Sequence, residues 1–435
     1  MAFNKKTIRE IDLTNKRALL RADYNVPVKN GAIIDDYRIK QSLPTIRLIL
    51  EQAASLVIVS HLGRPGGKAE PSLSLKPVAK RLSELLGREV SFASDCVGQE
   101  AKKAADVLGT GGILVLENVR FHPEEEKNDE KFAKAIIAGS GAEIFIQDGF
   151  GVVHRAHATT DAIARLLPAV AGPLLQKEVD AITTVIQNPQ RPLLAVVGGA
   201  KISDKIDILK HLMEIADCVA VAGAMANNFL LAGGEGVGKS LVEEEVLDTA
   251  REILKQARVT EQSRKFSFLV PVDVVVSTDI DGTKPTRVVD LSSHSLADIE
   301  AYPKLPTESS HTIGPDEAIF DIGPISAANI AGATRLARTV IWNGTCGVTE
   351  TKGIAGASDP FSHGTRQIVE AMIGDSNRHI NKPFTLVGGG DTAGYVESMG
   401  LVEDFNHVST GGGASLELMS GKALPGVEVL LNKDS

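Results

Sequence analysis

The sequence predicts an α/β protein of two domains, each built on a doubly wound parallel sheet of the Rossmann-like type and joined by a hinge helix. Short runs rich in Val, Ile and Leu alternate with amphipathic stretches along the chain, which is the pattern of strands and helices that build a parallel sheet. The runs are almost continuously apolar, as is typical of strands that helices cover on both faces. A chain of 435 residues exceeds the size that one hydrophobic core usually supports, so two domains are expected.

The predicted strands fall into two groups. The first group lies at 17–24, 55–60, 112–117 and 143–148. The second group lies at 193–198, 218–223, 267–276, 339–344 and 384–390. Between the groups, a helical pattern at 176–187 is bracketed by segments that contain proline, which indicates a linker. We therefore expect an N-terminal domain at 1–170, a hinge helix within 171–190 and a second domain at 191–415.

The composition restricts the classes of partner. The formal net charge of −9 argues against nucleic acid, because binding a phosphate backbone needs a cationic surface. The N-terminal sequence lacks the apolar stretch of a signal peptide, and no run reaches the roughly 18 apolar residues of a membrane span. The spacing of Cys96, Cys218 and Cys346 suggests neither a zinc site nor a disulfide framework. We expect a cytoplasmic protein with reduced thiols that binds neither membranes nor nucleic acid.

Charged and polar side chains follow the strands of the first group. The candidates for an anion site are Arg21, Asp23, Asn25, Arg38, His61, Arg64, Arg120, Arg155 and His157. Ligands of open parallel sheets bind beyond the carboxyl ends of the strands. The planar fork of arginine binds carboxylate and phosphate groups through paired hydrogen bonds. Any one of these arginines could instead form a surface salt bridge, but together they predict a side-chain-lined anion site.

Glycine turns follow the strands of the second group. Backbone N–H groups at the start of a helix suit nucleotide phosphates, so the turns at 388–393 and 409–415 are candidate phosphate sites. Lys201 and Lys205 are four residues apart, and on a helix they would share one face. Asp391 could hold Mg²⁺ directly or through water. Two anionic ligands on two domains predict transfer of a group between them, as in a kinase.

A second nucleotide motif is present at 233–240, where GGEGVGKS matches the P-loop pattern GxxxxGK[ST]. The acid-terminated apolar run at 272–279 could serve as its Walker B partner. However, a helical stretch separates the preceding strand from these glycines, and three glutamates follow at 243–245, close to where a triphosphate would lie. We interpret the segment as a glycine-rich loop between helices, and a P-loop NTPase remains the alternative function.

The motifs RADYNVP, SHLGRP, LENVRFHPEEE, HRAH, VGGAKISDK, IWNG, VGGGDTA and STGGGAS occur in this order. In order and spacing they resemble the phosphoglycerate kinase family, from residue 17 to about 430. The resemblance implies reversible, Mg²⁺-dependent phosphoryl transfer from 1,3-bisphosphoglycerate to ADP, giving 3-phosphoglycerate and ATP by direct in-line transfer after domain closure. It also implies a monomer, and a C-terminal peptide at 416–435 that returns to the N-terminal domain.

The resemblance assigns roles to individual positions. For 3-phosphoglycerate they are Arg21, Asp23, Tyr24, Asn25, Arg38, His61, Leu62, Gly63, Arg64, Arg120, Arg155 and His157. For the nucleotide they are Gly199, Ala200, Lys201, Lys205, Asn343, Glu350, Gly389, Gly390, Asp391 and Thr392. The transferring group would meet Arg38, Lys205, Gly389 and Gly412, and Asp391 would lie near Mg²⁺.

Some features differ from the family pattern. Thr345 and Cys346 follow WNG where proline is usual, Ala224 stands where many members have glycine, and 351–362 is longer than the usual link after Glu350. All of them lie on the nucleoside side, so the base preference stays open. Two other classes of protein are alternatives. A dinucleotide-dependent dehydrogenase would need GxGxxG directly after a strand, and the sequence has no such motif there. A catalytically silent scaffold would not need charged residues at the positions that do chemistry, whereas this sequence has all of them.

Overall fold

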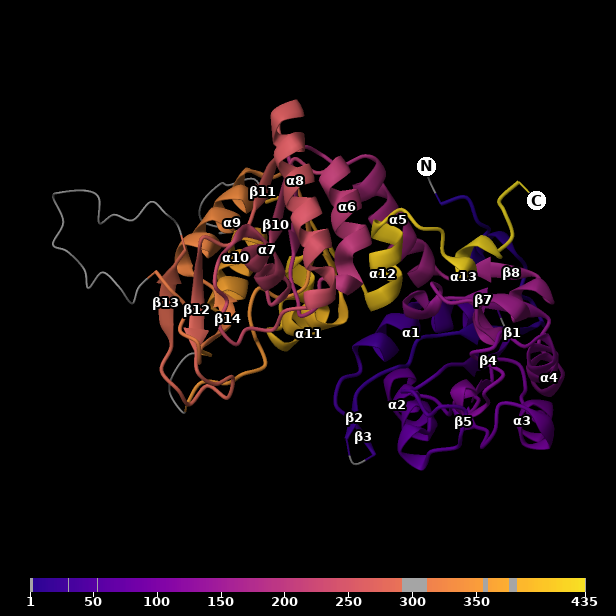
Figure 1. Cartoon of the computed structure of the whole chain (residues 1–435). Coiled ribbons are helices and arrows are strands. Elements are labelled where there is room, and N and C mark those ends of the chain that lie inside the picture. The colour runs from indigo at the N-terminus through magenta and orange to yellow at the C-terminus, as the bar shows by residue number, and fades with distance from the viewer. Residues whose placement is uncertain are drawn as a thin grey trace, which may run out of the picture. The chain divides into compact units, whose positions relative to one another are not determined.

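The computed structural model describes residues 3–29, 31–52, 54–291, 311–354, 359–374 and 382–434. The chain forms two compact units (Figure 1). Unit 1 comprises Met1–Thr183, Gly413–Leu418 and Lys422–Ser435, and unit 2 comprises Thr184–Gly412 and Met419–Gly421. Within the described ranges, no helix is long and apolar enough to cross a membrane.

Unit 1 is built on a parallel sheet of six strands in the order β5-β6-β4-β1-β7-β8. Its strands are β1 (Arg17–Arg21), β4 (Ser55–Val59), β5 (Ser91–Phe92), β6 (Ile113–Val115), β7 (Ile144–Gln147) and β8 (Ala169–Ala171). Strand β1 lies between β4 and β7, with Ala18 opposite both Leu56 and Ile144. The chain thus winds outward from β1 in both directions, so that the sheet is doubly wound.

The helices of unit 1 connect these strands, as expected for parallel neighbours. They are α1 (Tyr37–Glu51), α2 (Lys76–Leu86), α3 (Gly98–Asp106), α4 (Glu130–Ser140) and the short η1 (Ile8–Glu10), η2 (Pro71–Leu73), η3 (Val119–Phe121), η4 (Phe150–Val152), η5 (Ala158–Ala162) and η6 (Ile163–Arg165). A two-stranded hairpin, β2 (Val28–Lys29) and β3 (Ala32–Ile33), precedes α1.

Capping residues define the ends of helix α4. The side chain of Asp129 accepts a hydrogen bond from the backbone N–H of Phe132 at 2.8 Å, which satisfies one free donor of the first turn. Gly141 ends the helix in the left-handed conformation, where a side chain would be strained. Apolar residues of the strands, such as Leu20 and Ile58, and of α1 and α2, such as Ile46 and Leu82, form one buried core.

Unit 2 contains a parallel sheet of six strands in the order β11-β10-β9-β15-β16-β17. They are β9 (Leu193–Val197), β10 (Cys218–Val221), β11 (Ser267–Leu269), β15 (Thr339–Asn343), β16 (Phe384–Gly388) and β17 (His407–Val408). A second sheet is antiparallel, in the order β13-β12-β14, with β12 (Asp273–Ser277), β13 (Arg287–Asp290) and β14 (Ala318–Ile322).

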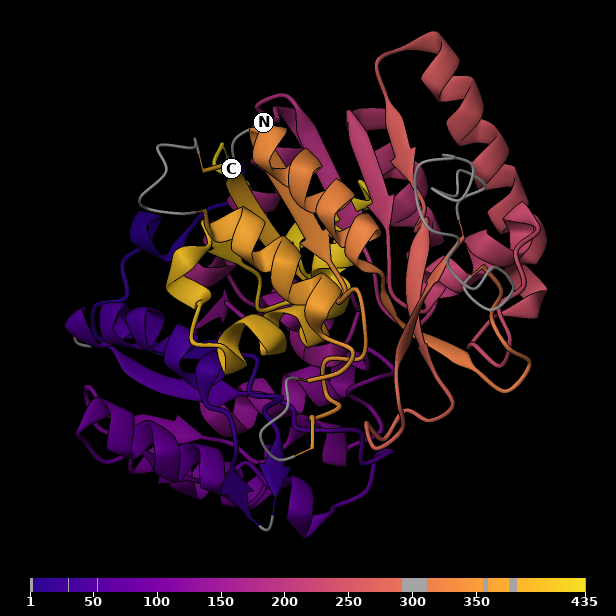
Figure 2. The ribbon, with the colours of Figure 1, turned by 90° about the vertical axis from the view of Figure 1, so that its left-hand side faces the viewer.

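The helices of unit 2 cover its parallel sheet. They are α6 (Ile206–Ile215), α7 (Met225–Gly233), α8 (Leu247–Ser263), α9 (Pro324–Leu336), α10 (His363–Ile373), α11 (Gly390–Ser398) and the short η7 (Ser203–Lys205), η8 (Glu244–Val246) and η10 (Val402–Asp404). Helices α9 and α10 pack side by side in the orange part of Figure 2. Their residues Ile330 and Ile368 join Trp342 of β15 in the core of this unit.

Helices α5 (Pro173–Gln187) and α12 (Gly412–Met419) each contain residues of both units, and α13 (Pro425–Glu428) follows them near the C-terminus. Helix α5 begins in unit 1 and ends in unit 2, and α13 belongs to unit 1. The predicted helix at 176–187 is therefore present and begins three residues earlier, at a proline that tolerates the first helical turn because it needs no N–H partner there.

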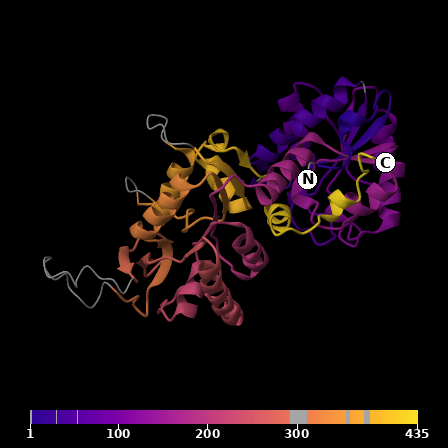
Figure 3. The ribbon, with the colours of Figure 1, turned by 90° about the horizontal axis from the view of Figure 1, so that it is seen from above.

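The N-terminal and C-terminal segments of the chain pair with each other in unit 1, and the two ends of the chain are marked in Figure 3. The backbone N–H of Lys6 donates to the carbonyl of Leu431 at 2.7 Å, and that of Lys433 donates to the carbonyl of Asn4 at 2.8 Å. Leu431 in turn donates to the carbonyl of Ala169, in the edge strand β8, at 3.0 Å. The C-terminal segment thus extends the hydrogen bonding of the unit 1 sheet.

The two parallel sheets confirm the predicted fold class, but parts of the strand prediction were wrong. The predicted strand at 267–276 is two strands, β11 and β12, that belong to different sheets. Pro271 lies between them, and proline cannot donate to a sheet ladder. The antiparallel sheet was not predicted. Strand β8 was also missed, because its three residues lie between Pro168 and Gly172, in one of the proline-containing segments that bracket the predicted hinge helix.

Candidate active site

Four arginines of unit 1 surround the buried side chain of His61, which follows strand β4. Burial lowers the pKa of His61 well below its usual value, and the positive charges of Arg21, Arg120, Arg38 and Arg155 lower it further. The imidazole is therefore neutral, and the concentrated positive charge is unsuited to a cationic ligand. This arrangement brings together side chains that follow four different strands.

Arg38 is held at this cluster by groups that follow strand β1. Its Nη1 atom lies 3.0 Å from the Oδ2 atom of Asp23 and donates to the carbonyl of Asn25 at 3.2 Å. The side-chain oxygen of Asn25 accepts a hydrogen bond from the backbone N–H of Gly63 at 2.9 Å. Arg38 lies in the first turn of α1 and is half-buried. Two predicted polar residues thus fix the guanidinium group and the loop after β4.

Arg120 and Arg155 are also fixed by local partners, whereas Arg64 is not. Arg120 donates to the carbonyl of Gly63 at 2.8 Å and lies 3.3 Å from the carboxylate of Glu126. The Nε atom of Arg155 lies 3.0 Å from the ring of His154. Arg64 is exposed and forms no hydrogen bond or ion pair with the described residues. It keeps all its donors for a ligand.

Three of the predicted substrate residues lie behind this surface rather than on it. Arg21 is 1% exposed and donates to Thr159 at 2.9 Å and to the carbonyl of Ala22 at 2.5 Å. The phenol of Tyr24 is buried and lies 3.0 Å from the hydroxyl of Ser42, so it is not available to a substrate. Leu62 is also buried. The side chains of these residues support the cluster, and the role of Tyr24 in substrate binding stays a prediction.

The last residue of the predicted basic patch, His157, lies beside a buried carboxylate. Its Nδ1 atom is 4.0 Å from Glu125, which accepts hydrogen bonds from Thr159 at 3.0 and 2.6 Å. Burial, followed by the charges of Arg120 and Arg21, lowers the pKa of His157 to about 4. His157 is therefore neutral and adds no charge to the patch.

In unit 2, the ammonium group of Lys205 contacts three oxygen atoms at the carboxyl end of the parallel sheet. It donates to the carbonyl of Gly198 at 2.6 Å, to the side-chain oxygen of Asn343 at 2.6 Å and to the carbonyl of Asn343 at 3.3 Å. Burial lowers its pKa to about 8, although the charges of Asp391 and Asp204 act in the opposite direction. The ammonium group is half-buried and pairs with no carboxylate of the described residues, so it is a good partner for an anionic ligand.

The glycine turn before α11 adds backbone and side-chain donors near the ammonium group of Lys205. Gly389 has φ of 93°, a conformation that other residues rarely adopt, and it leads directly into the helix at Gly390. The Nδ2 atom of Asn343 is buried and has no hydrogen-bond partner among the residues that the structure describes. It lies 3.2 Å from the position that a Cβ atom of residue 389 would occupy. The hydroxyl of Thr392 accepts from the backbone N–H of Gly344 at 2.6 Å.

A second helix start lies close to the first. A Cβ atom at Gly412, the first residue of α12, would lie 3.6 Å from the backbone nitrogen of Gly390. The predicted phosphate turns at 388–393 and 409–415 both open helices, as expected. Asp391, in the first turn of α11, is exposed and presents the carboxylate oxygen that Mg²⁺ prefers, so its position and chemistry fit the predicted metal role.

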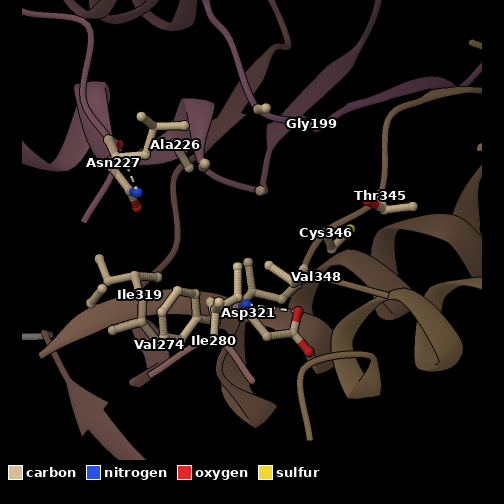
Figure 4. A pocket seen from close by; sticks show the side chains of 18 of the residues that line it. Gly199, Ala226, Asn227, Val274, Ile280, Ile319, Asp321, Thr345, Cys346 and Val348 are labelled. Atoms are coloured by element: carbon tan, nitrogen blue, oxygen red, sulfur yellow. Dashed lines mark hydrogen bonds between the residues drawn. The ribbon is translucent and has the colours of Figure 1, made fainter. Parts of the chain in front are cut away.

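A pocket of about 640 Å³ adjoins these groups (Figure 4). Its lining includes the predicted nucleotide residues Gly199, Ala200, Glu350 and Asp391. In Figure 4, Gly199 and Thr345 lie on one side, and Ala226, Asn227, Val274 and Ile319 lie on the other, where the wall is largely apolar. Pockets with apolar walls and few polar groups are typical of sites for small molecules and cofactors.

The structure contradicts the prediction of a shared helical face for Lys201 and Lys205, and it does not favour the alternative of a P-loop at Lys239. Lys201 lies in a loop and is exposed, while Lys205 ends the short helix η7, so the two do not share a helical face. Lys239 of the P-loop-like segment is exposed and paired with Asp316 at 2.6 Å. Helix α7, rather than a strand, enters that segment, which contradicts the strand–loop–helix arrangement of a P-loop.

The sequence reasoning missed two buried polar residues that line the pocket, Asn227 and Asp321. Asp321 accepts hydrogen bonds from the backbone N–H groups of Gly364 at 2.9 Å and Ile322 at 2.9 Å, and burial raises its pKa to about 7. A polar residue within an apolar helix or strand was the only sequence signal for either of them. The shape of the pocket could not be read from that signal.

Comparisons with known proteins show the family to which the chain belongs. A family model described as "Phosphoglycerate kinase" matches residues 8–422. The phosphoglycerate kinase of Pelotomaculum thermopropionicum is 44% identical over 429 residues, covering 99% of this chain and 100% of the relative. That of Chloroflexus aurantiacus is 45% identical over 431 residues, covering 98% and 99%.

Solved structures of the same family have a similar fold. The structure of phosphoglycerate kinase from Coxiella burnetii has a TM-score of 0.78 and 36% identity, covering 98% of both chains. The one from Pyrococcus horikoshii has a TM-score of 0.80 and 29% identity, also covering 98% of both. With a family model over nearly the whole chain, relatives above 40% identity and side-chain clusters suited to two anions, the chain belongs to the phosphoglycerate kinase family.

Proposed function

We propose that the arginine cluster of unit 1 binds 3-phosphoglycerate and that Lys205 and the glycine turn of α11 bind the phosphates of ADP and ATP. The chemistry is that of phosphoglycerate kinase, which the family and its named relatives support. An oxygen of the terminal phosphate of ADP attacks the phosphorus of the acyl phosphate of 1,3-bisphosphoglycerate. The bond from that phosphorus to the carboxyl oxygen breaks, and 3-phosphoglycerate leaves as a carboxylate.

This reaction needs no general base or covalent intermediate, because the attacking phosphate oxygen is already anionic and the carboxyl oxygen leaves as a carboxylate that needs no proton. Catalysis therefore depends on positioning and on stabilising the charge of the transferring group. We assign this stabilisation to Arg38, Lys205 and the N–H groups after Gly389 and Gly412. The observation that carries the assignment is the buried Nδ2 donor of Asn343, which no described residue engages and which lies next to an ammonium group and a helix start.

Within unit 1, neighbouring oxygen atoms hold Arg38 and Arg120, and no residue in the described part of the chain engages the donors of Arg64. Guanidinium groups suit the phosphate and the carboxylate of 3-phosphoglycerate. Asp23 and Asn25 orient Arg38 and the loop after β4, and they are the groups we assign to the substrate hydroxyl. Direct transfer requires the two ligands to come in line, and α5 is the segment proposed to permit that movement.

Mg²⁺ is the proposed cofactor, held by Asp391. When bound, the ion would neutralise part of the charge of the nucleotide phosphates. The substrates are small molecules, and we expect a cytoplasmic monomer that does not bind nucleic acid. The free thiols of Cys96, Cys218 and Cys346 agree with a reducing compartment.

The direct test is formation of ATP from 1,3-bisphosphoglycerate and ADP in the presence of Mg²⁺. Lys205→Ala is expected to lower turnover by about 100-fold or more, while binding of 3-phosphoglycerate, measured by calorimetry, stays within about twofold. Near-normal turnover of this variant would contradict the role given to Lys205. Absence of ATP formation by the unaltered protein would contradict the proposed function itself.

A further inference from the structure

Asn227 places an unused hydrogen-bond acceptor in the pocket of unit 2. Its side chain belongs to the first turn of α7, lines the pocket and is 1% exposed. The Nδ2 atom donates to the carbonyl of Leu241 at 3.1 Å. The Oδ1 atom is buried and has no hydrogen-bond partner among the described residues. A buried acceptor without a donor is costly, so a ligand that supplies the donor would be favoured.

The orientation of this amide is fixed by its surroundings. Rotating it by half a turn would direct Oδ1 at the carbonyl oxygen of Leu241, and two acceptors would face each other without a proton between them. The observed orientation keeps the donor on Leu241 and leaves the acceptor for the pocket. Figure 4 shows the amide of Asn227 pointing from α7 toward the interior of the pocket.

The neighbouring Asn228 has no such free atom. Its Nδ2 atom donates to the carbonyl of Glu243 at 2.8 Å, and its Oδ1 atom accepts from the backbone N–H of Glu243 at 3.2 Å. Both polar atoms of the Asn228 side chain therefore hold the loop after α7, whereas only the donor of the Asn227 side chain forms a hydrogen bond with the described residues. The two adjacent residues form a matched pair, one structural and one facing the pocket.

The chemistry around Asn227 suits a purine base. Ala226, Leu230, Val274 and Ile319 give this side of the pocket apolar walls, against which a flat base can pack. The groups proposed to bind phosphates, Lys205 and the turn before α11, are not on this wall. Gly199, which lies beside Lys205, is on the other side of the pocket in Figure 4. A nucleotide with its phosphates at Lys205 would thus direct its base toward Asn227.

We propose that the Oδ1 atom of Asn227 accepts a hydrogen bond from the 6-amino group of adenine and so selects adenine over guanine and hypoxanthine nucleotides. The latter two carry an oxygen at position 6, which would face Oδ1 as a second acceptor. A site built to bond a particular group rejects analogues that lack it, because its own polar atom is then left unpaired. The inference rests on the proposed nucleotide site and adds a residue that determines its base specificity.

The test compares ADP with inosine diphosphate, which carries oxygen in place of the 6-amino group. We expect kcat/KM for ADP to exceed that for inosine diphosphate by about tenfold, which corresponds to about 1.4 kcal/mol. Asn227→Leu is expected to reduce this preference to about twofold or less. Asn228→Leu, the control, is expected to lower the thermal unfolding temperature and to leave the ratio of the two substrates unchanged.

Each outcome supports or overturns the inference. Equal use of ADP and inosine diphosphate by the unaltered protein overturns it, and this measurement does not depend on any variant folding. An equal loss for both substrates in Asn227→Leu also overturns it, because the residue would then act on the fold rather than on the base. Failure to form ATP from ADP would instead count against the proposed function, so the two failures are distinguishable.

Discussion

Nucleotide affinity is expected to fall as the pH rises above 8, because the ammonium group of Lys205 loses its proton. Burial lowers the pKa of Lys205 from 10.5 to about 8, against the opposite effect of Asp391 and Asp204. A bound polyphosphate brings negative charge to the ammonium group and favours its protonated form. Above pH 8 the protein must therefore take up a proton in order to bind, and affinity falls about tenfold, or 1.4 kcal/mol, for each further pH unit.

Calorimetric titration with ADP at pH 7, 8 and 9 measures this effect. We expect the Kd to be about tenfold higher at pH 9 than at pH 7. Repeating the titration in buffers of different ionisation enthalpy reports the proton that is taken up. Lys205→Ala is expected to bind more weakly at pH 7 and to show no further loss at pH 9. The reasoning is refuted if the unaltered protein binds equally at both pH values, or if the variant shows the same loss.

Three further changes test other parts of the structure. Gly389→Ala is expected to weaken ADP binding about tenfold or more, because φ of 93° strains any side chain. The control is Gly394→Ala, inside the helix that follows Gly389, where a Cβ atom would meet open space, and equal calorimetric Kd values for the two variants would contradict the role of the turn. Burial raises the pKa of Asp148 from 3.8 to about 6, so the stability of the folded protein falls as the pH rises from about 4 through 6. Asp148→Asn should therefore gain up to about 3 kcal/mol relative to the unaltered protein between pH 4 and 7, and parallel thermal unfolding curves at both pH values would count against this. Arg38→Ala is expected to raise the Kd for 3-phosphoglycerate about 10- to 100-fold. In the unaltered protein, NMR should show no titration of the His61 ring between pH 5.5 and 8, because its low pKa keeps the ring neutral.

The parallel sheets could be predicted from the sequence because their strands are short apolar runs with turns at each end. The segment 193–197 is an example, since every residue of β9 is buried and none is polar. The antiparallel sheet gives a weaker signal. Strand β13 exposes part of its length, and β14 contains the buried polar residue Asp321. Neither strand has the uninterrupted apolar pattern that the sequence reasoning required.

The order of the motifs predicted which residues lie close together, but not which of them are buried and which can reach a ligand. Arg21 and Arg38 both follow from the same motif-based reasoning, yet one is buried behind His61 and the other is half-buried beside Asp23. The difference depends on side-chain packing from distant segments, such as the contact of Arg21 with Thr159. A sequence pattern does not contain that information.

The error at Lys201 has a specific cause. A four-residue spacing predicts a shared face only if the helix has already begun. Here the turn after β9 continues to Ile202, and the regular helix α6 begins only at Ile206. Glycine-rich turns end strands clearly but do not indicate how soon the next helix starts. Boundaries are therefore the least secure part of such a prediction.

The pairing of Lys6 with Leu431 affects the order in which the chain can fold during synthesis. A ribosome releases most of unit 1 first, then all of the continuous span of unit 2, and only afterwards the residues that complete unit 1. Unit 2 can therefore form its sheet on a chain that is still attached. Until residue 431 emerges, the carbonyl of Ala169 in edge strand β8 lacks its native partner. A nascent chain stalled before that point would carry an incomplete sheet edge that other strands could pair with.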